Sequence, residues 1–334
     1  MDGDVWTVVS TQDGLVDNEI ITIVAGPGES VWFGSYDQGV SRLYENEWNT
    51  LRTGDEIPSN AIGKIAVAKT GEIWFSHTDG VTAYDGEGFT TYKQFGTLED
   101  NAAYTLLIES DNTLWVGTWD GLARFKDQEW SVFPVENEEW FRDVNVINID
   151  NQGNYLFGTS YNGIYQWDGF EWTQSAHLQK IRGVDDILAA PNGDLWFASM
   201  YNGVYSYDGN ILKSYKAASG LLGNDYPFTL AINPEGVVWA GSFHGVSYFD
   251  GNHWNSYSEN DGLLGEVHDM VVDQQGTVWA GTNLGLYCFD GKRWTGYTTQ
   301  DGLGDNYIKQ LAVGLDGAIW IPGIGLSRFI PPLP

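Results

Sequence analysis

The sequence predicts an all-β fold, an eight-bladed β-propeller of four-stranded antiparallel blades, from three observations. The pattern Gly-x-aliphatic-Trp-apolar-small-Ser/Thr recurs along the chain at intervals of 40 to 43 residues, and a glycine follows each copy five to seven residues later. No segment shows a sustained apolar period of 3.6 residues. Four-stranded units of about 40 residues with recurring Gly and Trp are typical of propellers. The eight Trp positions are Trp32, Trp74, Trp115, Leu156, Trp196, Trp239, Trp279 and Trp320.

Each unit is expected to contain four short strands, as the first unit illustrates. An apolar run at Ile20–Ala25 forms the first strand, and the Trp segment Val31–Ser35 forms the second. Apolar and polar residues alternate in Val40–Tyr44, as expected for a half-buried third strand. A tight turn then leads into a fourth strand that begins at Trp48.

The eighth unit lacks a fourth strand at the C-terminus, and the N-terminus supplies a matching segment. Residues Trp6–Leu15 read WTVVSTQDGL, and Trp294–Leu303 read WTGYTTQDGL. We therefore expect residues 5–10 to complete the last blade. Such closure removes exposed sheet edges, so residues 1–334 are predicted to form one closed propeller domain.

Two segments carry a resemblance to a known family. Asp301–Asn306 reads DGLGDN and Gly276–Thr282 reads GTVWAGT. They resemble two-component-regulator propeller repeats, which commonly form the extracytoplasmic sensory part of hybrid histidine kinases and often sense glycans. The streptogramin lyases are a similar-looking seven-bladed group that performs catalysis. The fold alone therefore does not decide between binding and chemistry.

Composition limits the partners. Lys and Arg number 16 against 45 Asp and Glu, a formal net charge of −29. Nucleic acids and anionic membranes are bound by clustered Lys and Arg, so neither is an expected partner. No stretch approaches about 18 consecutive apolar residues, so membrane insertion is not expected. We expect a monomer that binds a small molecule or glycan.

Cysteine, histidine and the N-terminal residues bear on cofactors and compartment. The single cysteine, Cys288, excludes an intramolecular disulfide framework and multi-thiolate metal sites. No metal site and no cofactor are predicted, although calcium stays open because the loops are rich in oxygen ligands. Met1–Trp6 lacks the features of a signal peptide. The chain is therefore either cytoplasmic or, as the resemblance implies, periplasmic or extracellular after removal of a leader.

Residues that depart from the repeat are candidates for ligand contact. Fourteen of the 16 Trp recur in register and are expected to pack in the core, whereas Trp119 and Trp140 do not recur. Trp119 lies in a turn between the second and third strands. Other such turns carry Tyr161, Tyr201, Phe243 and His244. These rings either seal the loops against each other or form a stacking platform for a sugar, aromatic or isoprenoid ligand.

The first strands, predicted to border a central channel, carry unusual charges. Arg142 and Arg182 interrupt a recurring Asn column. Three residues further on, one column contains Tyr104, Asn145, Asp185, Phe228, His268 and Lys309, and the next contains Asp186 and Asp269. A strand alternates its faces, so only one of these columns is expected to face the channel, and a bulge could shift which one. The Arg and Asp side chains either pair with each other or line a polar funnel.

Two main functions follow from these candidates. The first is a non-enzymatic binding module whose aromatic-rimmed funnel recognises a small molecule or glycan. The second is a lyase, or an acid–base isomerase or cyclase. In it Asp185 or Asp186, together with His268, would donate or abstract protons. Arg142 and Arg182 would hold an anion, and Tyr104, Trp119 and Phe228 would cradle an apolar ligand. A protein-interaction scaffold is a third alternative.

Overall fold

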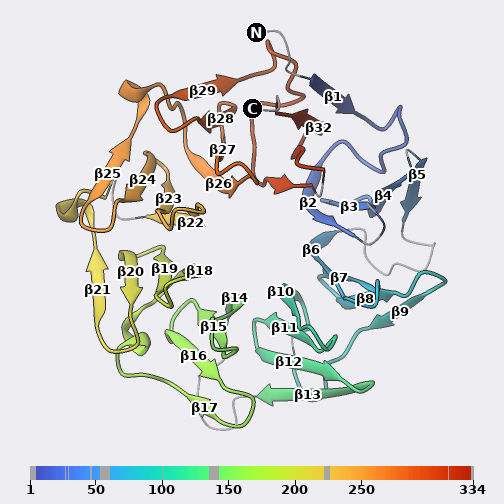
Figure 1. Cartoon of the computed structure of the whole chain (residues 1–334). Coiled ribbons are helices and arrows are strands. Elements are labelled where there is room, and N and C mark those ends of the chain that lie inside the picture. The colour runs from blue at the N-terminus through green and yellow to red at the C-terminus, as the bar shows by residue number, and fades with distance from the viewer. Residues whose placement is uncertain are drawn as a thin grey trace. The chain divides into compact units, whose positions relative to one another are not determined.

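The computed structural model confirms the predicted fold class. It describes residues 5–26, 28, 30–45, 47–52, 61–99, 101–134, 143–221, 226–314 and 316–331. The described strands form eight four-stranded antiparallel sheets, the blades of a β-propeller (Figure 1). The chain divides into two compact units. Unit 1 comprises residues 1–144, 302–305 and 310–334, and unit 2 comprises residues 145–301 and 306–309. The expectation of a single domain stays a prediction.

Unit 1 contains four blades, numbered by their order in the sequence. Blade 1 consists of β2 (Ile20–Ala25), β3 (Val31–Ser35), β4 (Val40–Tyr44) and β5 (Glu47–Leu51). Blade 2 consists of β6 (Ile62–Val67), β7 (Ile73–His77), β8 (Gly80–Tyr84) and β9 (Phe89–Tyr92). Blade 3 consists of β10 (Ala103–Ile108), β11 (Leu114–Thr118), β12 (Gly121–Lys126) and β13 (Glu129–Pro134). Blade 8 consists of β30 (Ala312–Val313), β31 (Ile319–Gly323), β32 (Gly325–Ile330) and β1 (Val5–Val9).

Unit 2 contains the other four blades. Blade 4 consists of β14 (Val144–Ile149), β15 (Tyr155–Thr159), β16 (Ile164–Trp167) and β17 (Trp172–Thr173). Blade 5 consists of β18 (Val184–Ala189), β19 (Leu195–Ser199), β20 (Gly203–Tyr207) and β21 (Leu212–Tyr215). Blade 6 consists of β22 (Pro227–Ile232), β23 (Val238–Ser242), β24 (Gly245–Phe249) and β25 (Trp254–Tyr257). Blade 7 consists of β26 (Val267–Val272), β27 (Val278–Thr282), β28 (Leu286–Phe289) and β29 (Trp294–Tyr297).

Short 3₁₀ helices lie between some of these strands. They are η2 (Leu178–Lys180), η3 (Ala217–Ser219) and η4 (Glu259–Asp261). Within the described ranges, no helix is long and apolar enough to cross a membrane.

The N-terminal strand completes blade 8, as the sequence match predicts. β1 pairs antiparallel with β32, with Val5 opposite Ile330 and Val9 opposite Leu326. The Trp6 and Phe329 rings pack with their centroids 4.5 Å apart. The two matching segments, Trp6–Leu15 and Trp294–Leu303, also form equivalent hydrogen bonds. The backbone N–H groups of Thr11 and Thr299 donate to the side-chain oxygens of Asn18 and Asn306 over 2.9 and 2.8 Å, so part of the recurring Asn column holds loops in place.

The in-register Trp residues of the second strands are core residues. All seven are less than 5% exposed. In unit 1, Trp74 of blade 2 packs with Leu114, Val116 and Phe125 of blade 3. The fourth-strand Trp residues are less uniform, because Trp254 and Trp294 are buried whereas Trp6, Trp48, Trp130 and Trp172 are half-buried. Core packing is therefore strongest at the second strand.

The repeat glycine is required by backbone geometry. Gly39 has a φ of +110°, and a Cβ there would lie 2.1 Å from the backbone oxygen of Leu51. Gly80 has a φ of +130°, and a Cβ would lie equally close to the oxygen of Tyr92. Only glycine tolerates both the positive φ and this approach of the fourth strand.

An aspartate fixes the turn between the third and fourth strands in several blades. In blade 5, Asp208 Oδ1 accepts hydrogen bonds from the backbone N–H groups of Ile211 and Asn210, over 2.7 and 2.9 Å. These donors hold the Asp208 pKa below its ordinary value. The same arrangement occurs at Asp85, Asp168, Asp250 and Asp290. The Asp of each Asp-Gly turn therefore caps it.

We expect Asp208→Ala to lower the melting temperature modestly at neutral pH, whereas Asp208→Asn should be milder because its amide oxygen can still accept both bonds. A lowered folded-state pKa stabilises the fold above the unfolded-state pKa, and that contribution is lost as pH falls through the folded-state value. The gap between wild type and Asp208→Ala should therefore narrow in acid. Melting curves at neutral and acidic pH measure it, and a gap that widens in acid would contradict the capping role.

Candidate functional site

The first strands of unit 2 contain β-bulges that decide how the two candidate columns are placed. The pairing register shifts between Val184 and Asp186 in β18, between Pro227 and Thr229 in β22, and between Val267 and Asp269 in β26. The residue inside each bulge is left out of the ladder. These residues are Asp185, Phe228 and His268, which we call the bulge row.

The second column joins neighbouring blades. Asp186 Oδ2 accepts a hydrogen bond from the backbone N–H of Leu230 over 2.8 Å, which ties blade 5 to blade 6. Asp269 Oδ1 accepts from the Thr229 hydroxyl over 3.4 Å, which ties blade 7 to blade 6. These two carboxylates therefore hold the first strands level with one another. The bulge row consequently occupies corresponding positions on three consecutive blades.

Asp185 has a carboxylate oxygen with unmet hydrogen-bonding capacity. Its Oδ2 is buried and has no hydrogen-bond partner among the residues that the structure describes. Burial raises the pKa of Asp185 from its ordinary value of 3.8 to about 7. Among the described residues no Arg or Lys lowers this pKa. Arg142 lies outside them, so the Arg–Asp pair that the sequence offers as one alternative stays a prediction. Near neutral pH the side chain can thus either donate or accept a proton.

His268 offers a second buried polar atom of this kind. Its Nε2 is buried and has no partner within the described ranges. Burial lowers the pKa of His268, Glu266 opposes this shift and Lys309 adds to it. The His268 ring lies 5.3 Å from the ring of Tyr307. Lys309 is exposed, and its Nζ lies 5.6 Å from the centroid of the same tyrosine ring. At neutral pH His268 is therefore uncharged and able to hydrogen-bond.

An aromatic pair lies on the blade between Asp185 and His268. Phe228 contacts Phe243 edge to face, with ring centroids 4.3 Å apart. Phe243 belongs to the turn between β23 and β24, and 43% of it is exposed. In the corresponding turns of blades 4 and 5, Tyr161 and Tyr201 are also exposed. These turns give unit 2 an exposed aromatic rim next to the bulge row.

The remaining predicted residues of unit 2 have diverse surroundings. Asn145 Nδ2 donates to the Ser160 hydroxyl over 2.7 Å, which occupies part of its side chain. The side chains of Arg182 and His244 are exposed. The Arg182 backbone oxygen accepts a 2.6 Å bond from the Ser199 hydroxyl. Arg182 is thus anchored by its backbone while its guanidinium stays at the surface.

Two predicted residues lie in blade 3 of unit 1. Tyr104 is the bulge residue of β10, and both Tyr104 and Trp119 are 44% exposed. The backbone oxygen of Trp119 accepts from the N–H of Asp143 over 2.9 Å, which fixes the turn. Trp119 is therefore a surface ring, as its departure from the repeat predicts. Arg142 and Trp140 lie outside the described residues.

Tyr226 and Tyr307 are aromatic residues that the sequence reasoning missed. Both lie in connections between blades, directly after the Asn column, and 40% and 46% of them are exposed. Their recurrence directly after the Asn column is the sequence signal that points to them. Tyr307 matters most, because it contacts both His268 and Lys309.

The chemistry of this site is hydrogen bonding and ring contact. Among the described residues, no group of three or more His, Cys, Asp or Glu side chains could hold a metal ion. The three ion pairs found in the described ranges all lie in other places, at Lys126–Asp111, Arg293–Asp290 and Arg328–Asp316. The bulge row instead presents a carboxyl group, a phenyl ring and a neutral imidazole in sequence.

Comparison with known proteins bears on the fold. No protein-family model matches the chain, and no curated protein matches it. Among solved structures the chain is similar to streptogramin B lyase, with 13% identity, a TM-score of 0.62 and 98% of each chain covered. It is also similar to PorZ, a surface component of the type-IX secretion system of Porphyromonas gingivalis. That match has 18% identity and a TM-score of 0.62, and it covers 90% of this chain and 55% of PorZ.

A third similar structure is the extracellular domain of a putative hybrid two-component system of B. thetaiotaomicron. The identity is 16% and the TM-score 0.59, and the match covers 80% of this chain and 37% of that one. This chain therefore spans well under two thirds of the length of the sensor and secretion proteins. At these identities the likeness shows the fold alone, and in that respect the resemblance to sensor and lyase propellers is confirmed.

Proposed function

We propose that this protein is a ligand-binding propeller, a sensor-type binding module whose ligand is a small molecule or glycan held at the bulge row. The supporting observation is the pair of buried, unpartnered polar atoms, Asp185 Oδ2 and His268 Nε2, on either side of the Phe228–Phe243 ring pair. Buried polar atoms are nearly always hydrogen-bonded, so an orphaned pair beside exposed rings suits a ligand with hydroxyl groups and an apolar face.

The rim supports the same proposal. Tyr161, Tyr201 and Phe243 are exposed aromatic residues on three consecutive blades of unit 2. A sugar ring presents C–H groups on one face and hydroxyl groups at its edge, so it can contact such rings and still reach polar atoms. The sensor domains that share this fold are compatible with a binding role.

Binding is tested by titrating the full chain with neutral oligosaccharides of glucose, galactose and mannose in a calorimeter. We expect Asp185→Asn and Phe228→Ala to weaken binding of whichever sugar binds. Glu171→Gln, which changes an exposed carboxylate in the β16–β17 turn, is the matched control and should leave binding unchanged. Equal affinity of wild type and both bulge-row variants would refute a ligand at this row.

A lyase or an acid–base isomerase or cyclase is the second candidate, favoured by the directions in which the pKa values of Asp185 and His268 are shifted. Burial raises the Asp185 pKa to about 7 and lowers that of His268. A carboxyl group that titrates near neutral pH, together with an uncharged imidazole, suits proton abstraction and return. Cleavage of streptogramin B, the substrate named for the similar lyase, is the first reaction to assay. Turnover that Asp185→Asn and His268→Gln abolish would replace the binding-module proposal with this one.

Asp185 should also give the protein a specific pH dependence. Its folded-state pKa is raised above the unfolded-state value, so the folded state binds more protons between about pH 4 and pH 7. Stability should therefore fall as pH rises through this window. Asp185→Asn should remove that part of the decline, and Glu171→Gln should not. Melting temperatures at about pH 5 and about pH 8 measure the effect, and parallel curves for wild type and Asp185→Asn would contradict the burial of this carboxyl.

A further inference from the structure

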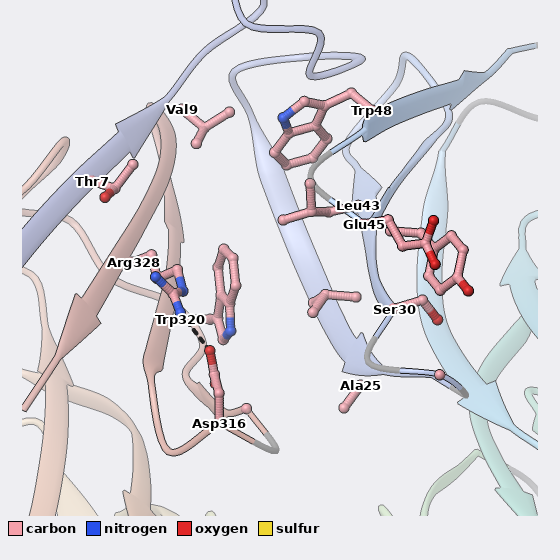
Figure 2. A pocket seen from close by; sticks show the side chains of 14 residues that line it. Thr7, Val9, Ala25, Ser30, Leu43, Glu45, Trp48, Asp316, Trp320 and Arg328 are labelled. Atoms are coloured by element: carbon pink, nitrogen blue, oxygen red, sulfur yellow. Dashed lines mark hydrogen bonds and ion pairs between the residues drawn. The ribbon is translucent and has the colours of Figure 1, made fainter.

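A cavity of about 670 Å³ lies within unit 1, and none of the bulge-row residues lines it. It is bounded by blade 8 on one side and by blade 1 on the other. Figure 2 shows Trp320 and Arg328 on the blade 8 wall, with Leu43 and Trp48 on the facing wall. Its volume falls in the range of about 300–1,000 Å³ that is usual for small-molecule sites.

In other blades, aromatic rings fill the space beside the second-strand Trp that corresponds to this cavity. A second-strand Trp normally stacks on a ring from the fourth strand of its own blade, with centroids 5.6 to 6.5 Å apart. It also meets a ring from the third strand of the following blade, at 5.3 to 5.5 Å. Trp74, for example, has Tyr92 on one side and Phe125 on the other.

Trp320 lacks both of these rings. Val9 of β1 occupies the fourth-strand position, since it pairs with Leu326 as Tyr92 pairs with Val81. Leu43 of β4 occupies the third-strand position, since it pairs with Trp48 as Tyr84 pairs with Phe89.

Each of the other six second-strand Trp residues keeps at least one of the two rings. Val9 and Leu43 both line the cavity, so the cavity is the space that two aromatic rings would fill.

Polar groups lie beside this space. Arg328 covers the Trp320 ring, with its Cζ 5.4 Å from the ring centroid, and it forms an ion pair with Asp316. Thr7 and Ser30 also line the cavity (Figure 2). A molecule that fills the apolar part can therefore place a polar substituent against hydrogen-bonding groups.

We propose that this cavity binds a small molecule with one planar aromatic ring, of phenol to indole size. The ring replaces the missing tyrosine and phenylalanine rings beside Trp320, and a hydroxyl or N–H substituent is directed to the polar groups around Arg328. The chemical class follows from the other blades, where the same Trp face accepts phenol and phenyl rings. The site is separate from the bulge row, and neither proposal depends on the other.

The test uses the full chain and two probes, indole and phenol, with cyclohexanol as a probe of similar size without a π face. Binding is followed by calorimetry and by the indole N–H resonance of Trp320, assigned through Trp320→Phe. Indole and phenol should bind and shift this resonance, and cyclohexanol should bind more weakly.

Restoring the repeat should close the site. In Val9→Tyr/Leu43→Phe the two rings return, so affinity for indole should fall at least about tenfold, equivalent to about 1.4 kcal/mol. The control is Val8→Tyr, which adds the same ring on the same strand but at a side chain that is 45% exposed and does not line the cavity. Its affinity should stay at the wild-type value.

Two results would overturn the proposal. One is an unchanged Trp320 resonance in wild type up to the solubility limit of indole. The other is equal indole affinity in wild type and Val9→Tyr/Leu43→Phe, which would place the bound indole elsewhere.

Discussion

Deleting residues 1–10 is expected to cause aggregation or a large loss of melting temperature. The deletion removes β1, which pairs with β32 along five residues, and it exposes the edge of β32. It also removes Trp6 from Phe329, which is fully buried in the intact chain. An aromatic pair is worth about 0.5–1.5 kcal/mol beyond the area that it buries, and the loss of the whole strand adds to this cost. An unpaired edge further promotes association between chains.

Melting curves and light scattering on the truncated and full chains measure this effect. Trp6→Ala, which keeps the strand and removes only the ring, should show a smaller loss and stay monomeric. A truncated chain as stable and as monomeric as the full one would contradict the role of β1 in closing blade 8.

Replacing each of two nearby tryptophans of blade 3 by alanine should lower the free energy of unfolding by very different amounts. Trp115 is fully buried, it stacks on Phe133 at 5.6 Å, and its Nε1 donates to Glu109 over 2.6 Å. Trp115→Ala should therefore cost about 3–5 kcal/mol. Trp119 is 44% exposed in a turn, so Trp119→Ala should cost less than about 1 kcal/mol.

Urea unfolding of both variants beside wild type gives the two free energies of unfolding. The fluorescence difference between wild type and Trp119→Phe should show a water-exposed, red-shifted indole. If Trp119→Ala destabilises the protein as much as Trp115→Ala, Trp119 is a packing residue and is not available to a ligand.

Much of the fold could be predicted from the sequence because repetition supplies an internal comparison. Eight copies of one pattern give the number of blades, and four apolar segments per copy give the strands. The burial of Trp115 and the exposure of Trp119 follow from whether each residue recurs. The match between Trp6–Leu15 and Trp294–Leu303 predicts the pairing of β1 with β32, since equivalent segments form equivalent hydrogen bonds.

The candidate site could be predicted only in part from the sequence. The sequence predicts Asp185, Asp186, His268 and Asp269 as candidates for lining the channel. The alternation of side chains along a strand does not say which of the two columns is available to a ligand. The bulges decide it, because one extra residue in a strand shifts every later side chain to the other face. Asp186 and Asp269 consequently bond to the neighbouring blade, whereas Asp185 and His268 each keep a buried atom without a partner.

The sequence by itself thus determined the repeat, the strand order, the closing strand and the Trp core, because these depend on local pattern and on equivalence between copies. Only the tertiary structure decided which polar atoms are orphaned and where space remains. Val9 and Leu43 are unremarkable departures when each is considered alone. They create a cavity because blade packing brings both against Trp320, and hydrogen-bond register and packing between blades are properties that no single repeat contains.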